Sequence, residues 1–353
     1  MKIVTVIGAR PQFIKAAPLS RELRKRHTEV LVHTGQHYDE NMSAVFFREL
    51  GIPEPDHNLN IGSGSHGAQT GAMLAGIEKV LLKEKPDLLL VYGDTNSTVA
   101  GALAAVKLHI PLAHVEAGLR SYNRSMPEEI NRVVTDHLSD WLFVPSESSR
   151  ENLAREGITN GVHIVGDIMF DAVLLFTAKA RKISPYPAAL GIGDEEYYLC
   201  TVHRAENTDS PENLSHIFGI LATLDRKVVF PVHPRTRKKI AEYGLTPSDN
   251  LVLAEPLGYL DMLKCLESAA VVLTDSGGIQ KEAYYLKVPC VTLRRETEWV
   301  ETAEVNWNAV TSLDERRIFE ALDRYSRGMP LHPPLYGEGD TAAKIVTALE
   351  RGW

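Results

Sequence analysis

The sequence predicts an α/β protein built from two doubly wound, Rossmann-like domains, on the strength of three observations. Short apolar runs alternate with segments of helical periodicity, which is typical of parallel sheets covered by helices on both faces. The 353 residues suffice for two domains, each with its own core. The apolar runs form two series, separated by the linker-like segment 182–187. We therefore expect domains at 1–170 and 171–340, and a C-terminal helix within 341–353 that packs back across the domain junction.

The expected strands are the apolar runs themselves. In the first domain they lie at 2–8, 29–35, 87–94, 111–118, 141–146 and 163–167. In the second domain they lie at 197–204, 227–234, 250–256, 270–276 and 289–294. Helical periodicity between the first-domain runs is clearest at 68–84 and 97–108. Nearly every run ends in glycine or polar residues. Because open α/β sheets place their sites at the carboxyl ends of strands, we expect an active site in the cleft between the two domains.

Composition and charge argue against several classes of function. Hydrophobic residues make up 44% of the chain and charged residues 24%, as in a soluble globular protein. The net charge of −8 argues against nucleic acid and anionic membranes as partners, so an anionic ligand must meet local basic residues. No apolar run is long enough to cross a bilayer, and residues 1–8 indicate a strand rather than a signal peptide. We expect a cytoplasmic protein.

Cysteine usage supports the same compartment. Cys200, Cys265 and Cys290 are widely spaced and odd in number, which predicts buried free thiols in a reducing environment. The sequence contains no CxxC pair and no HExxH motif, which gives a structural zinc or zincin site little support. We expect neither a metal nor an organic cofactor.

The stretch TDSGGIQKEA indicates a phosphate-binding turn between a strand and a helix. Gly277 and Gly278 let the backbone approach an anion closely, and the N–H groups at a helix start attract negative charge. Ser276 adds a hydroxyl, and Glu282 follows where a carboxylate can take a ribose hydroxyl pair. The structural alternative is an ordinary helix cap made by Asp275 or Ser276.

A second glycine turn opens a helix in GARPQFIK, where Arg10 and Lys15 can point at an anion. It is not a Walker A loop, which ends in glycine, lysine and serine or threonine. The alternative is a solvated basic helix start, although cations near a helix N-terminus are disfavoured unless an anion joins them. Residues 62–67, GSGSHG, fit GxGxxG, but no buried strand precedes them. We predict a flexible loop over the cleft there rather than a nicotinamide site.

Three carboxylates are the acid/base candidates: Asp94, Glu116 and Glu129. Asp94 and Glu116 end neighbouring predicted strands and are expected to face one cleft. A single carboxylate at a strand end more often caps a helix or pairs with an arginine, here Arg120 or Arg132. Three from one domain favour catalysis.

The helix that carries Glu129 is predicted to begin with a capping box, SMPE, formed by Ser125 and Glu128. In that arrangement Glu128 has a structural task and Glu129 is left free for chemistry.

The second domain supplies basic residues that suit a phosphorylated ligand. His203 and Arg204 follow a predicted buried strand, so His203 is placed to contact a diphosphate or to shuttle a proton. His233 follows another strand, with Arg235 and Arg237 beside it. A lone histidine is more often structural, and we assign that role to three others. These are His37, His57 and His163.

With these residues in place, the chain resembles the non-hydrolysing UDP-N-acetylglucosamine 2-epimerases. The matching stretches are GARPQFIKAAP, TGQHYDENM, VYGDTNST, HVEAGLRS, MPEEINR, TVHRAEN, PVHPRTR and TDSGGIQKEA, which span almost the whole chain. The resemblance implies a glycosyltransferase-B fold, a UDP-sugar substrate and a homodimer.

The resemblance also implies site roles, position by position. Asp94, Glu116 and Glu129 correspond to catalytic carboxylates, and His203 to an active-site histidine near the leaving diphosphate. The remaining correspondences concern binding: Arg10 and the Ser276–Gly277 turn would hold phosphate, Lys15 would lie in the cleft, and Glu282 would take the ribose.

Two departures leave alternatives open. Many members have an allosteric substrate site with an arginine element, but the region 64–73 contains no arginine, so substrate activation stays open. Gln12 and the segment TEWVE, 297–301, resemble a related branch that epimerises UDP-2,3-diacetamido-2,3-dideoxyglucuronic acid. A UDP-sugar glycosyltransferase, a hydrolysing epimerase and a non-catalytic nucleotide-sugar sensor are further alternatives.

The chemistry explains why such residues are needed. The C2 proton of an N-acetylhexosamine has no adjacent carbonyl, so a lone carboxylate cannot remove it directly. Loss of UDP from C1 builds positive charge there and acidifies the C2–H bond. Elimination to a bound 2-acetamidoglucal, followed by re-addition and protonation from the other face, needs acid/base groups and a firm hold on the diphosphate.

Overall fold

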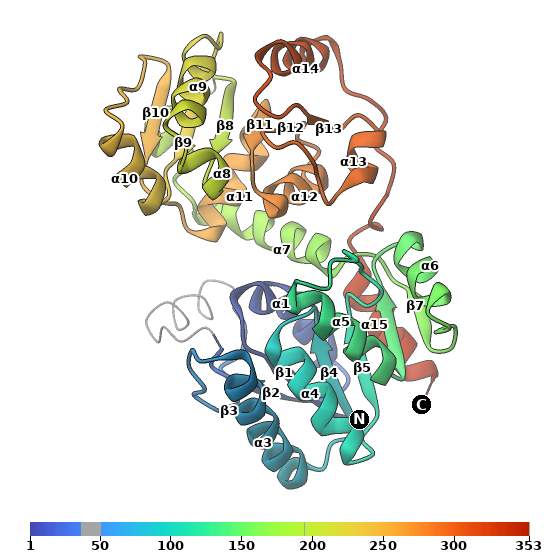
Figure 1. Ribbon diagram of the computed structural model, residues 1–353. Coiled ribbons are helices and arrows are strands. Elements are labelled where there is room, and N and C mark those ends of the chain that lie inside the picture. The colour runs from blue at the N-terminus through green and yellow to red at the C-terminus, as the bar shows by residue number, and fades with distance from the viewer. Residues whose placement is uncertain (37–50, 194, 353) are drawn as a thin grey trace. The chain divides into compact units, whose positions relative to one another are not determined.

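The computed structural model describes residues 1–36, 51–193 and 195–352. The chain divides into two compact units (Figure 1). The first unit comprises Met1–Ala172 and Tyr336–Trp353, and the second comprises Val173–Leu335. The division falls inside a helix, Ile168–Ile183, and residues 336–340 belong to the first unit. None of the described helices combines the length and apolar character that crossing a membrane requires.

The first unit is built on a seven-stranded parallel sheet with strand order β3-β2-β1-β4-β5-β6-β7. Its strands are β1 (Lys2–Ile7), β2 (Thr28–His33), β3 (His57–Asn58), β4 (Leu88–Tyr92), β5 (Leu112–Val115), β6 (Trp141–Val144) and β7 (Val162–Ile164). Its helices are α1 (Arg10–Leu23), α3 (His66–Glu84), α4 (Asn96–Lys107), α5 (Pro127–Leu138), α6 (Glu147–Arg155), the start of α7 (Ile168–Ile183) and α15 (Thr341–Arg351). The six predicted strands are confirmed. The two-residue β3 was not predicted, because it lacks an apolar run.

Alternation along the strands gives the first sheet two apolar faces. Val4 and Val6 of β1 share one face with Val91 of β4, and α3 and α4 pack there through side chains such as Met73 and Ile77. Helix α1 contacts β1, β2 and β4, and α15 packs against α1. Burial on both faces explains why these strands are continuous apolar runs.

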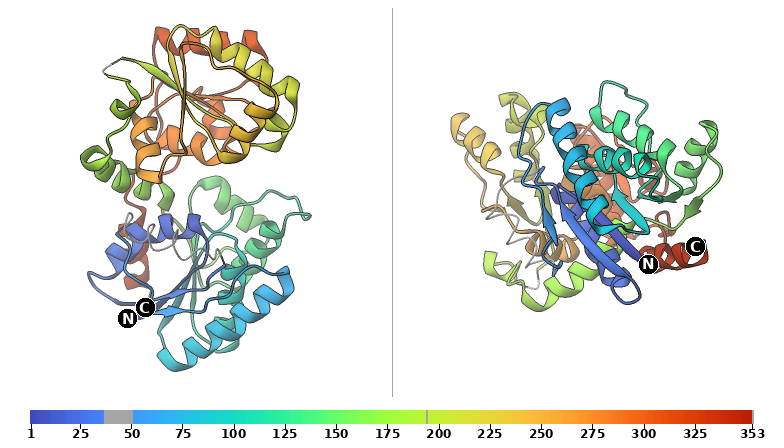
Figure 2. Two further views of the ribbon diagram at one scale, coloured as in Figure 1. Left: turned by 90° about the vertical axis from the view of Figure 1, so that its left-hand side faces the viewer. Right: turned by 90° about the horizontal axis from the view of Figure 1, so that it is seen from below.

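Helix α15 is fixed to the first unit at its N-terminus. The carboxylate of Asp171 accepts hydrogen bonds from the backbone N–H groups of Thr341 at 3.1 Å and Ala342 at 2.8 Å. These are two of the N–H groups that a helix start cannot satisfy within the helix. The two chain ends consequently lie side by side on this unit (Figure 2).

The second unit holds a six-stranded parallel sheet with strand order β10-β9-β8-β11-β12-β13. Its strands are β8 (Tyr197–Thr201), β9 (Lys227–Pro231), β10 (Leu251–Ala254), β11 (Val271–Thr274), β12 (Cys290–Thr292) and β13 (Asn308–Val310). Its helices are the rest of α7, α8 (Ala205–Thr208), α9 (Pro211–Ala222), α10 (Pro234–Glu242), α11 (Tyr259–Ser268), α12 (Gly277–Tyr285), α13 (Val300–Glu304) and α14 (Glu315–Arg327), with a 3₁₀ turn at Ala188–Leu190. Helices α9 and α14 cover one face of the sheet, and α11 and α12 cover the other. The five predicted strands are confirmed, and β13 was not predicted.

The strand orders bring the predicted site residues to one edge of each sheet. In the first unit β1, β4 and β5 are neighbours, and Arg10, Asp94 and Glu116 follow their carboxyl ends. In the second unit β9, β8 and β11 are neighbours, followed by His233, His203 and Ser276, respectively. Each group lies where the strand order reverses, which is the usual ligand position in doubly wound sheets.

Candidate active site

Glu116 occupies a constrained position directly after β5. Its φ is +68°, a left-handed conformation that is uncommon for a residue with a side chain, and it is buried. Its Oε2 forms an ion pair with Nζ of Lys15 from α1. Burial alone lowers the pKa of Lys15, but attraction to Glu116 outweighs this and raises the pKa above its ordinary value. The anion that Lys15 was predicted to meet is therefore, within this unit, the Glu116 carboxylate.

Gly93, at the end of β4, makes room for this pair. A Cβ atom added at Gly93 would lie 3.4 Å from Oε2 of Glu116 and 3.9 Å from Nζ of Lys15. The φ of Gly93 is +60°, which a glycine adopts without strain. The charge of the next residue, Asp94, also helps to raise the pKa of Lys15.

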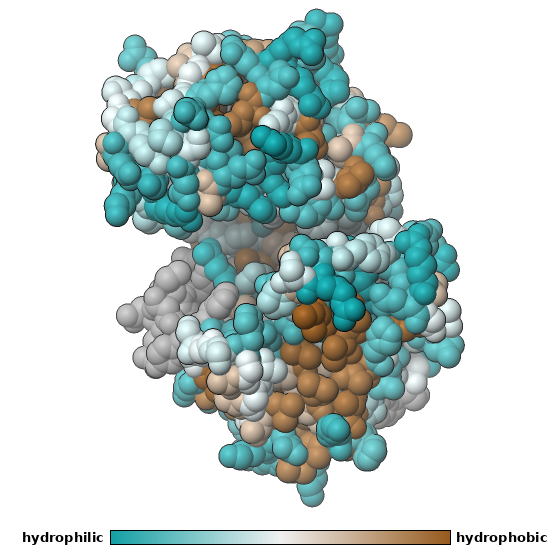
Figure 3. Space-filling view, in the orientation of Figure 1, coloured by the Kyte–Doolittle hydropathy of each residue, from teal (hydrophilic) through white to brown (hydrophobic). Residues whose placement is uncertain are grey.

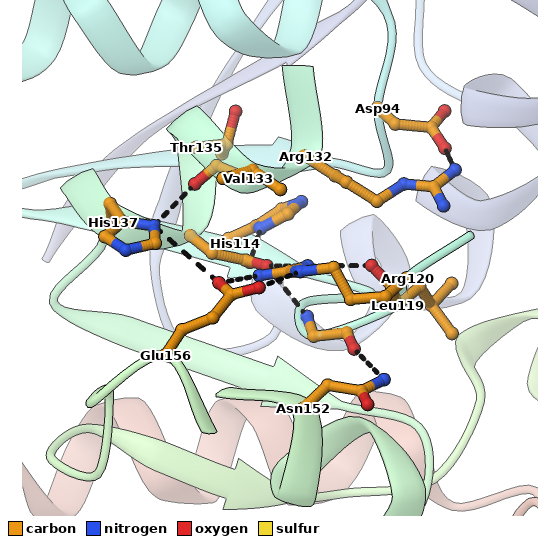
Figure 4. A network of polar contacts seen from close by, with 12 residues as sticks. Asp94, His114, Leu119, Arg120, Arg132, Val133, Thr135, His137, Asn152 and Glu156 are labelled. Atoms are coloured by element: carbon orange, nitrogen blue, oxygen red, sulfur yellow. Dashed lines mark hydrogen bonds and ion pairs between the residues drawn. The ribbon is translucent and has the colours of Figure 1, made fainter. Parts of the chain in front are cut away.

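Asp94 is held by an arginine, as the structural alternative predicted. Arg132 of α5 pairs with Oδ2 of Asp94 (Figure 4). Its other terminal nitrogen lies 3.1 Å from Oε2 of Glu129. Nδ2 of Asn131 donates to the backbone oxygen of Asp94 at 3.0 Å. Arg132 therefore links two of the three candidate carboxylates. Arg120 instead pairs with Asp136 and Glu156.

The predicted capping box at the start of α5 is wrong. The helix begins at Pro127 after Met126, whose side chain makes no capping hydrogen bond, and the hydroxyl of Ser125 donates to Asn123 at 2.6 Å. Proline is favoured at the first helical position, which places the N-cap at Met126 rather than at Ser125. Glu128 is exposed at this helix start.

Glu129 is buried and fully engaged rather than free. Its carboxylate accepts hydrogen bonds at 2.9 Å from the backbone N–H and the hydroxyl of Ser121 and from the N–H of Tyr122. Burial raises its pKa, but these donors and Arg132 outweigh burial and lower the pKa below its ordinary value. Glu129 is thus an ionised anchor for the loop between β5 and α5.

Gln12 has a structural role that the sequence did not reveal. Its buried Oε1 accepts from the N–H groups of Gly8 at 2.8 Å and Ala9 at 3.0 Å. Its Nε2 donates to the backbone oxygen of Tyr92 at 2.9 Å. Gln12 therefore ties the first turn of α1 to the end of β4, while Arg10 is exposed at that turn.

In the second unit a buried aspartate organises the turn after β8. The carboxylate of Asp275 accepts from the backbone N–H groups of His203 at 3.1 Å and Arg204 at 3.0 Å, and from Nδ2 of Asn207 at 3.0 Å. The side chains of His203 and Arg204 remain 47% and 43% exposed. This buried acceptor holds the backbone while the side chains of His203 and Arg204 stay accessible.

The glycine turn after β11 leads into α12 as predicted. Ser276 is the N-cap, and its hydroxyl accepts from the N–H of Ile279 at 3.4 Å, so the alternative of a serine cap is confirmed. A Cβ atom at Gly277 would lie 3.2 Å from Oε2 of Glu298, whereas at Gly278 the nearest atom is 3.9 Å away. Glu282 lies on α12 and is buried.

Glu298 and Trp299 of the predicted TEWVE segment flank this helix start. Arg294 donates two hydrogen bonds of 2.8 Å to the Glu298 carboxylate, and Arg204 lies 3.7 Å from it. Burial raises the pKa of Glu298, but the Arg294 hydrogen bonds outweigh it and lower the pKa. Nε1 of Trp299 donates to the backbone oxygen of Gly277 at 2.7 Å. The segment is therefore built around the turn where phosphate binding is predicted.

His233 and its neighbouring arginines are more engaged than predicted. Nδ1 of His233 accepts from the N–H of Arg235 at 3.2 Å and caps α10. Arg235 pairs with Asp209 at 2.5 Å, and Arg237 lies 3.1 Å from Glu255. His233 and Arg235 are exposed, whereas Arg237 is partly buried.

Comparison with known proteins decides the family. The family described as UDP-N-acetylglucosamine 2-epimerase matches residues 21–350. The chain belongs to this family. A UDP-N-acetylglucosamine 2-epimerase homolog from Methanococcus maripaludis is 54% identical, with 99% of each chain covered. The UDP-2,3-diacetamido-2,3-dideoxy-D-glucuronate 2-epimerase of Pseudomonas aeruginosa is 48% identical, covering 99% of this chain and 100% of the relative.

Solved structures agree with this membership. Two structures of the Methanocaldococcus jannaschii UDP-GlcNAc 2-epimerase cover 100% of both chains, at 45% and 46% identity, with TM-scores of 0.92 and 0.84. The second of these contains UDP-GlcNAc and UDP. The two parallel-sheet units of the epimerase thus form the predicted glycosyltransferase-B fold.

Several residues of the epimerase site escaped the sequence analysis. Pairing of Lys15 with Glu116 joins side chains 101 positions apart, which no local pattern reveals. The GSGSHG stretch runs into α3, which begins at His66, and it follows only the short, partly exposed β3, so it lacks the buried strand of a dinucleotide fingerprint. Gln69 of α3 accepts from Nδ2 of Asn96 at 2.8 Å. The structural role assigned to His37 lies outside the described residues.

Proposed function

We propose that this epimerase reversibly inverts C2 of UDP-N-acetylglucosamine to give UDP-N-acetylmannosamine without hydrolysing the sugar nucleotide. The observation that carries the proposal is the pair of carboxylates at the ends of neighbouring strands. Asp94 follows β4 and Glu116 follows β5, and each is fixed by a cation, Arg132 and Lys15, respectively. Family membership and the M. jannaschii relative solved with UDP-GlcNAc and UDP support this substrate.

The proposed reaction begins with cleavage of the C1–O bond to UDP. A carboxylate removes the C2 proton, and the electron pair of the C2–H bond forms the C1=C2 double bond of 2-acetamidoglucal. In the return step a proton adds to C2 from the opposite face and the UDP oxygen attacks C1. One positioned acid or base contributes roughly 10²- to 10⁴-fold to such a step.

The contacts divide the roles of the three carboxylates. Glu129 is held ionised by Ser121, Tyr122 and Arg132, so it is a poor proton acceptor. Its task is to fix the loop and to hold Arg132 against Asp94. Asp94 and Glu116, without that set of backbone donors, are the groups that exchange protons with the substrate.

The second unit supplies the hold on UDP. The first N–H groups of α12 and the exposed side chains of His203 and Arg204 can donate hydrogen bonds to a diphosphate. Glu282 would accept the ribose hydroxyls, and Arg10 of the first unit and His233 would add positive charge. A leaving diphosphate that stays bound is what separates epimerisation from hydrolysis.

A second candidate substrate is UDP-2,3-diacetamido-2,3-dideoxyglucuronate. The P. aeruginosa 2-epimerase of that name is 48% identical over nearly the whole chain. Trp299 of the TEWVE segment bonds to Gly277, and Nζ of Lys281 lies 4.0 Å from the centre of its ring. Gln12 is buried among backbone partners, so it does not itself select the sugar. The two substrates are distinguished by comparing kcat/KM for each under the same conditions.

A homodimer is also proposed, because α5 carries its apolar stripe outward. Glu129, Thr135 and Asp136 face inward, whereas Ile130 is 51% exposed. Figure 3 shows a continuous hydrophobic surface over α4 and α5. Apolar patches of this kind mark protein contacts, and two-fold pairing of like patches is the commonest closed assembly.

Sedimentation velocity tests the dimer. We expect Ile130→Glu to yield monomers, whereas Ile183→Glu, at an exposed position on α7, leaves the dimer intact. A wild-type protein that sediments as a monomer at micromolar concentration contradicts the proposal.

Positional isotope exchange tests the elimination step. UDP-N-acetylglucosamine carrying ¹⁸O between C1 and the β-phosphorus is incubated with enzyme. If the C1–O bond breaks and reforms, the label spreads to the non-bridging oxygens of the β-phosphate. Epimerised product in which the label stays in the bridge excludes UDP elimination.

A further inference from the structure

A buried hydrogen-bonded chain connects the two turns that carry Asp94 and Glu116. Nε2 of His114 lies 2.7 Å from the backbone oxygen of Gly93, and its Nδ1 lies 2.7 Å from Oδ1 of Asp136. Oδ2 of Asp136 accepts from the N–H of Gly118 at 3.1 Å. Asp94 follows Gly93 directly, and Glu116 precedes Gly118 by two residues. One side-chain pair therefore bridges the ends of β4 and β5.

The partners fix the protonation of His114. A backbone carbonyl and an ionised carboxylate only accept hydrogen bonds, so both ring nitrogens must donate, which requires the imidazolium form. Asp136 is ionised because its second oxygen accepts from Gly118 and from Arg120 at 2.6 Å. Burial raises the pKa of Asp136, but His114 and Arg120 outweigh burial and lower it.

The charges of this network balance. Arg120 donates to Glu156 through Nε and one terminal nitrogen, both at 2.7 Å, and to its neighbour's carbonyl oxygen, that of Leu119 (Figure 4). Two cations, His114 and Arg120, thus alternate with two anions, Asp136 and Glu156. His114 and Asp136 are completely buried, where an unpaired charge is strongly disfavoured. All hydrogen bonds of this network are kept only if both ring nitrogens of His114 are protonated.

We infer that His114, as a buried imidazolium held by Asp136, is a positioning residue that fixes Asp94 and Glu116 relative to each other. We call the hydrogen-bonded pair of His114 and Asp136 the clamp. It acts on backbone atoms: the Gly93 N–H donates to the backbone oxygen of Val115 at 3.0 Å, and the Gly93 carbonyl oxygen accepts from Nε2 of His114. Both turns contain left-handed residues, at Gly93, Glu116 and Gly118. Their conformation depends on surrounding contacts rather than on local preference.

The catalytic consequence of the clamp rests on the proposed function. Two carboxylates that act on one carbon must keep their separation, and a misplacement of about 1 Å can lower the rate roughly 10²-fold. We expect His114→Asn and Asp136→Asn to lower kcat about 10- to 10²-fold and to leave KM and UDP affinity nearly unchanged.

The control must lose a comparable hydrogen bond away from the clamp. Asp140 accepts from the N–H of Leu112 at 2.9 Å, at the opposite end of β5. Asp140→Asn, at an exposed position, should keep kcat and should lower the melting temperature less than Asp136→Asn, which also removes the buried carboxylate that pairs with His114. Equal kcat in Asp136→Asn and Asp140→Asn would mean that the clamp has no effect on catalysis, and it would overturn the inference.

Histidine ring NMR of the wild-type protein tests the clamp without relying on activity. Two-bond ¹H–¹⁵N spectra at neutral pH should show both ring nitrogens of His114 protonated, identified by loss of the signal in His114→Asn. A neutral ring with one bare nitrogen contradicts the clamp. If the enzyme instead epimerises no UDP-sugar but His114 is doubly protonated, the proposed function fails and the clamp stands.

Discussion

The acid/base candidates of the first unit are largely buried, whereas the side chains of His203 and Arg204 in the second unit are accessible. In the first unit the candidate acid/base groups are paired and largely buried: the side chains of Glu116 and Glu129 are 6% and 4% exposed, and those of Lys15 and Arg132 are 18% and 14% exposed. In the second unit the side chains of His203 and Arg204 are nearly half exposed. There the buried charge is Asp275, which holds the backbone beneath them.

This difference in exposure corresponds to the two proposed tasks of the site, proton exchange and nucleotide binding. Proton exchange at one carbon requires carboxylates with fixed positions, and pairing with cations supplies that rigidity. Binding and release of a nucleotide require cations that the ligand can reach. We therefore expect substitutions in the first unit to lower turnover, and substitutions in the second unit to lower affinity for UDP.

The largest effect is expected for Glu116→Gln. The amide keeps the shape of the side chain but cannot accept a proton, so kcat should fall by at least about 10²-fold. Affinity for UDP, measured by calorimetry, should change little. Glu128→Gln, at an exposed position on α5, is the matched control and should retain full turnover. Near-normal turnover in Glu116→Gln removes this residue from the chemistry.

The next effect concerns Arg204→Ala in the second unit. Loss of a charge-assisted contact to a phosphate should weaken UDP binding about 10-fold or more, since such hydrogen bonds contribute about 1.5–3 kcal/mol. Arg237→Ala is the control, because Arg237 is occupied by Glu255 and the backbone oxygen of Ala254. Calorimetric titration with UDP measures both, and equal affinities would remove Arg204 from the nucleotide site.

Separate substitutions of Gly277 and Gly278 test how closely UDP approaches the turn before α12. Gly277→Ala places a methyl group 3.2 Å from Oε2 of Glu298, so it should disturb the free protein and lower its melting temperature. Gly278→Ala has room in the free protein, its nearest neighbour being Oγ of Ser276 at 3.9 Å. A loss of UDP affinity in Gly278→Ala would then indicate that UDP lies close to Gly278. Unchanged affinity in that variant would argue against this contact.

The smallest effect is expected in the pH dependence of stability. The pKa of Glu129 is lowered from an ordinary value of 4.5, so its contacts stabilise the fold above that pH and are lost as pH falls through the lower folded-state pKa. Urea unfolding at a series of pH values should show a shallower acid decline for Glu129→Gln than for the wild type. Glu128→Gln should follow the wild type. Identical curves for Glu129→Gln and wild type would contradict the anchoring role.

The sequence predicted the sheets well because their signal is local. Continuous apolar runs identified eleven of the strands, and the residue types after them marked the edges at which Asp94, Glu116, His203 and Ser276 now lie. The strands β3 and β13 were not predicted, since β3 consists of two polar residues and β13 has only two consecutive apolar residues.

The contacts of the site were less predictable because they join distant residues. The partner of Glu116 comes from α1, and the acceptors of His114 come from β4 and α5. The capping box predicted at Ser125 is wrong because Pro127 takes the first helical position, one residue later than the motif implied. The sequence therefore predicted where the carboxylates lie, but not the hydrogen bonds and ion pairs that hold them in position.

Proton exchange at C2 distinguishes an epimerase from a sensor or a transferase. UDP-N-acetylglucosamine is incubated with the protein in D₂O and followed by proton NMR at the C2 and anomeric positions. The account predicts a new UDP-N-acetylmannosamine anomeric signal, deuterium at C2 of both nucleotide sugars, and no free N-acetylmannosamine. Absence of C2 exchange in both UDP-N-acetylglucosamine and UDP-2,3-diacetamido-2,3-dideoxyglucuronate, despite UDP binding, would contradict it and favour a sensor or a transferase.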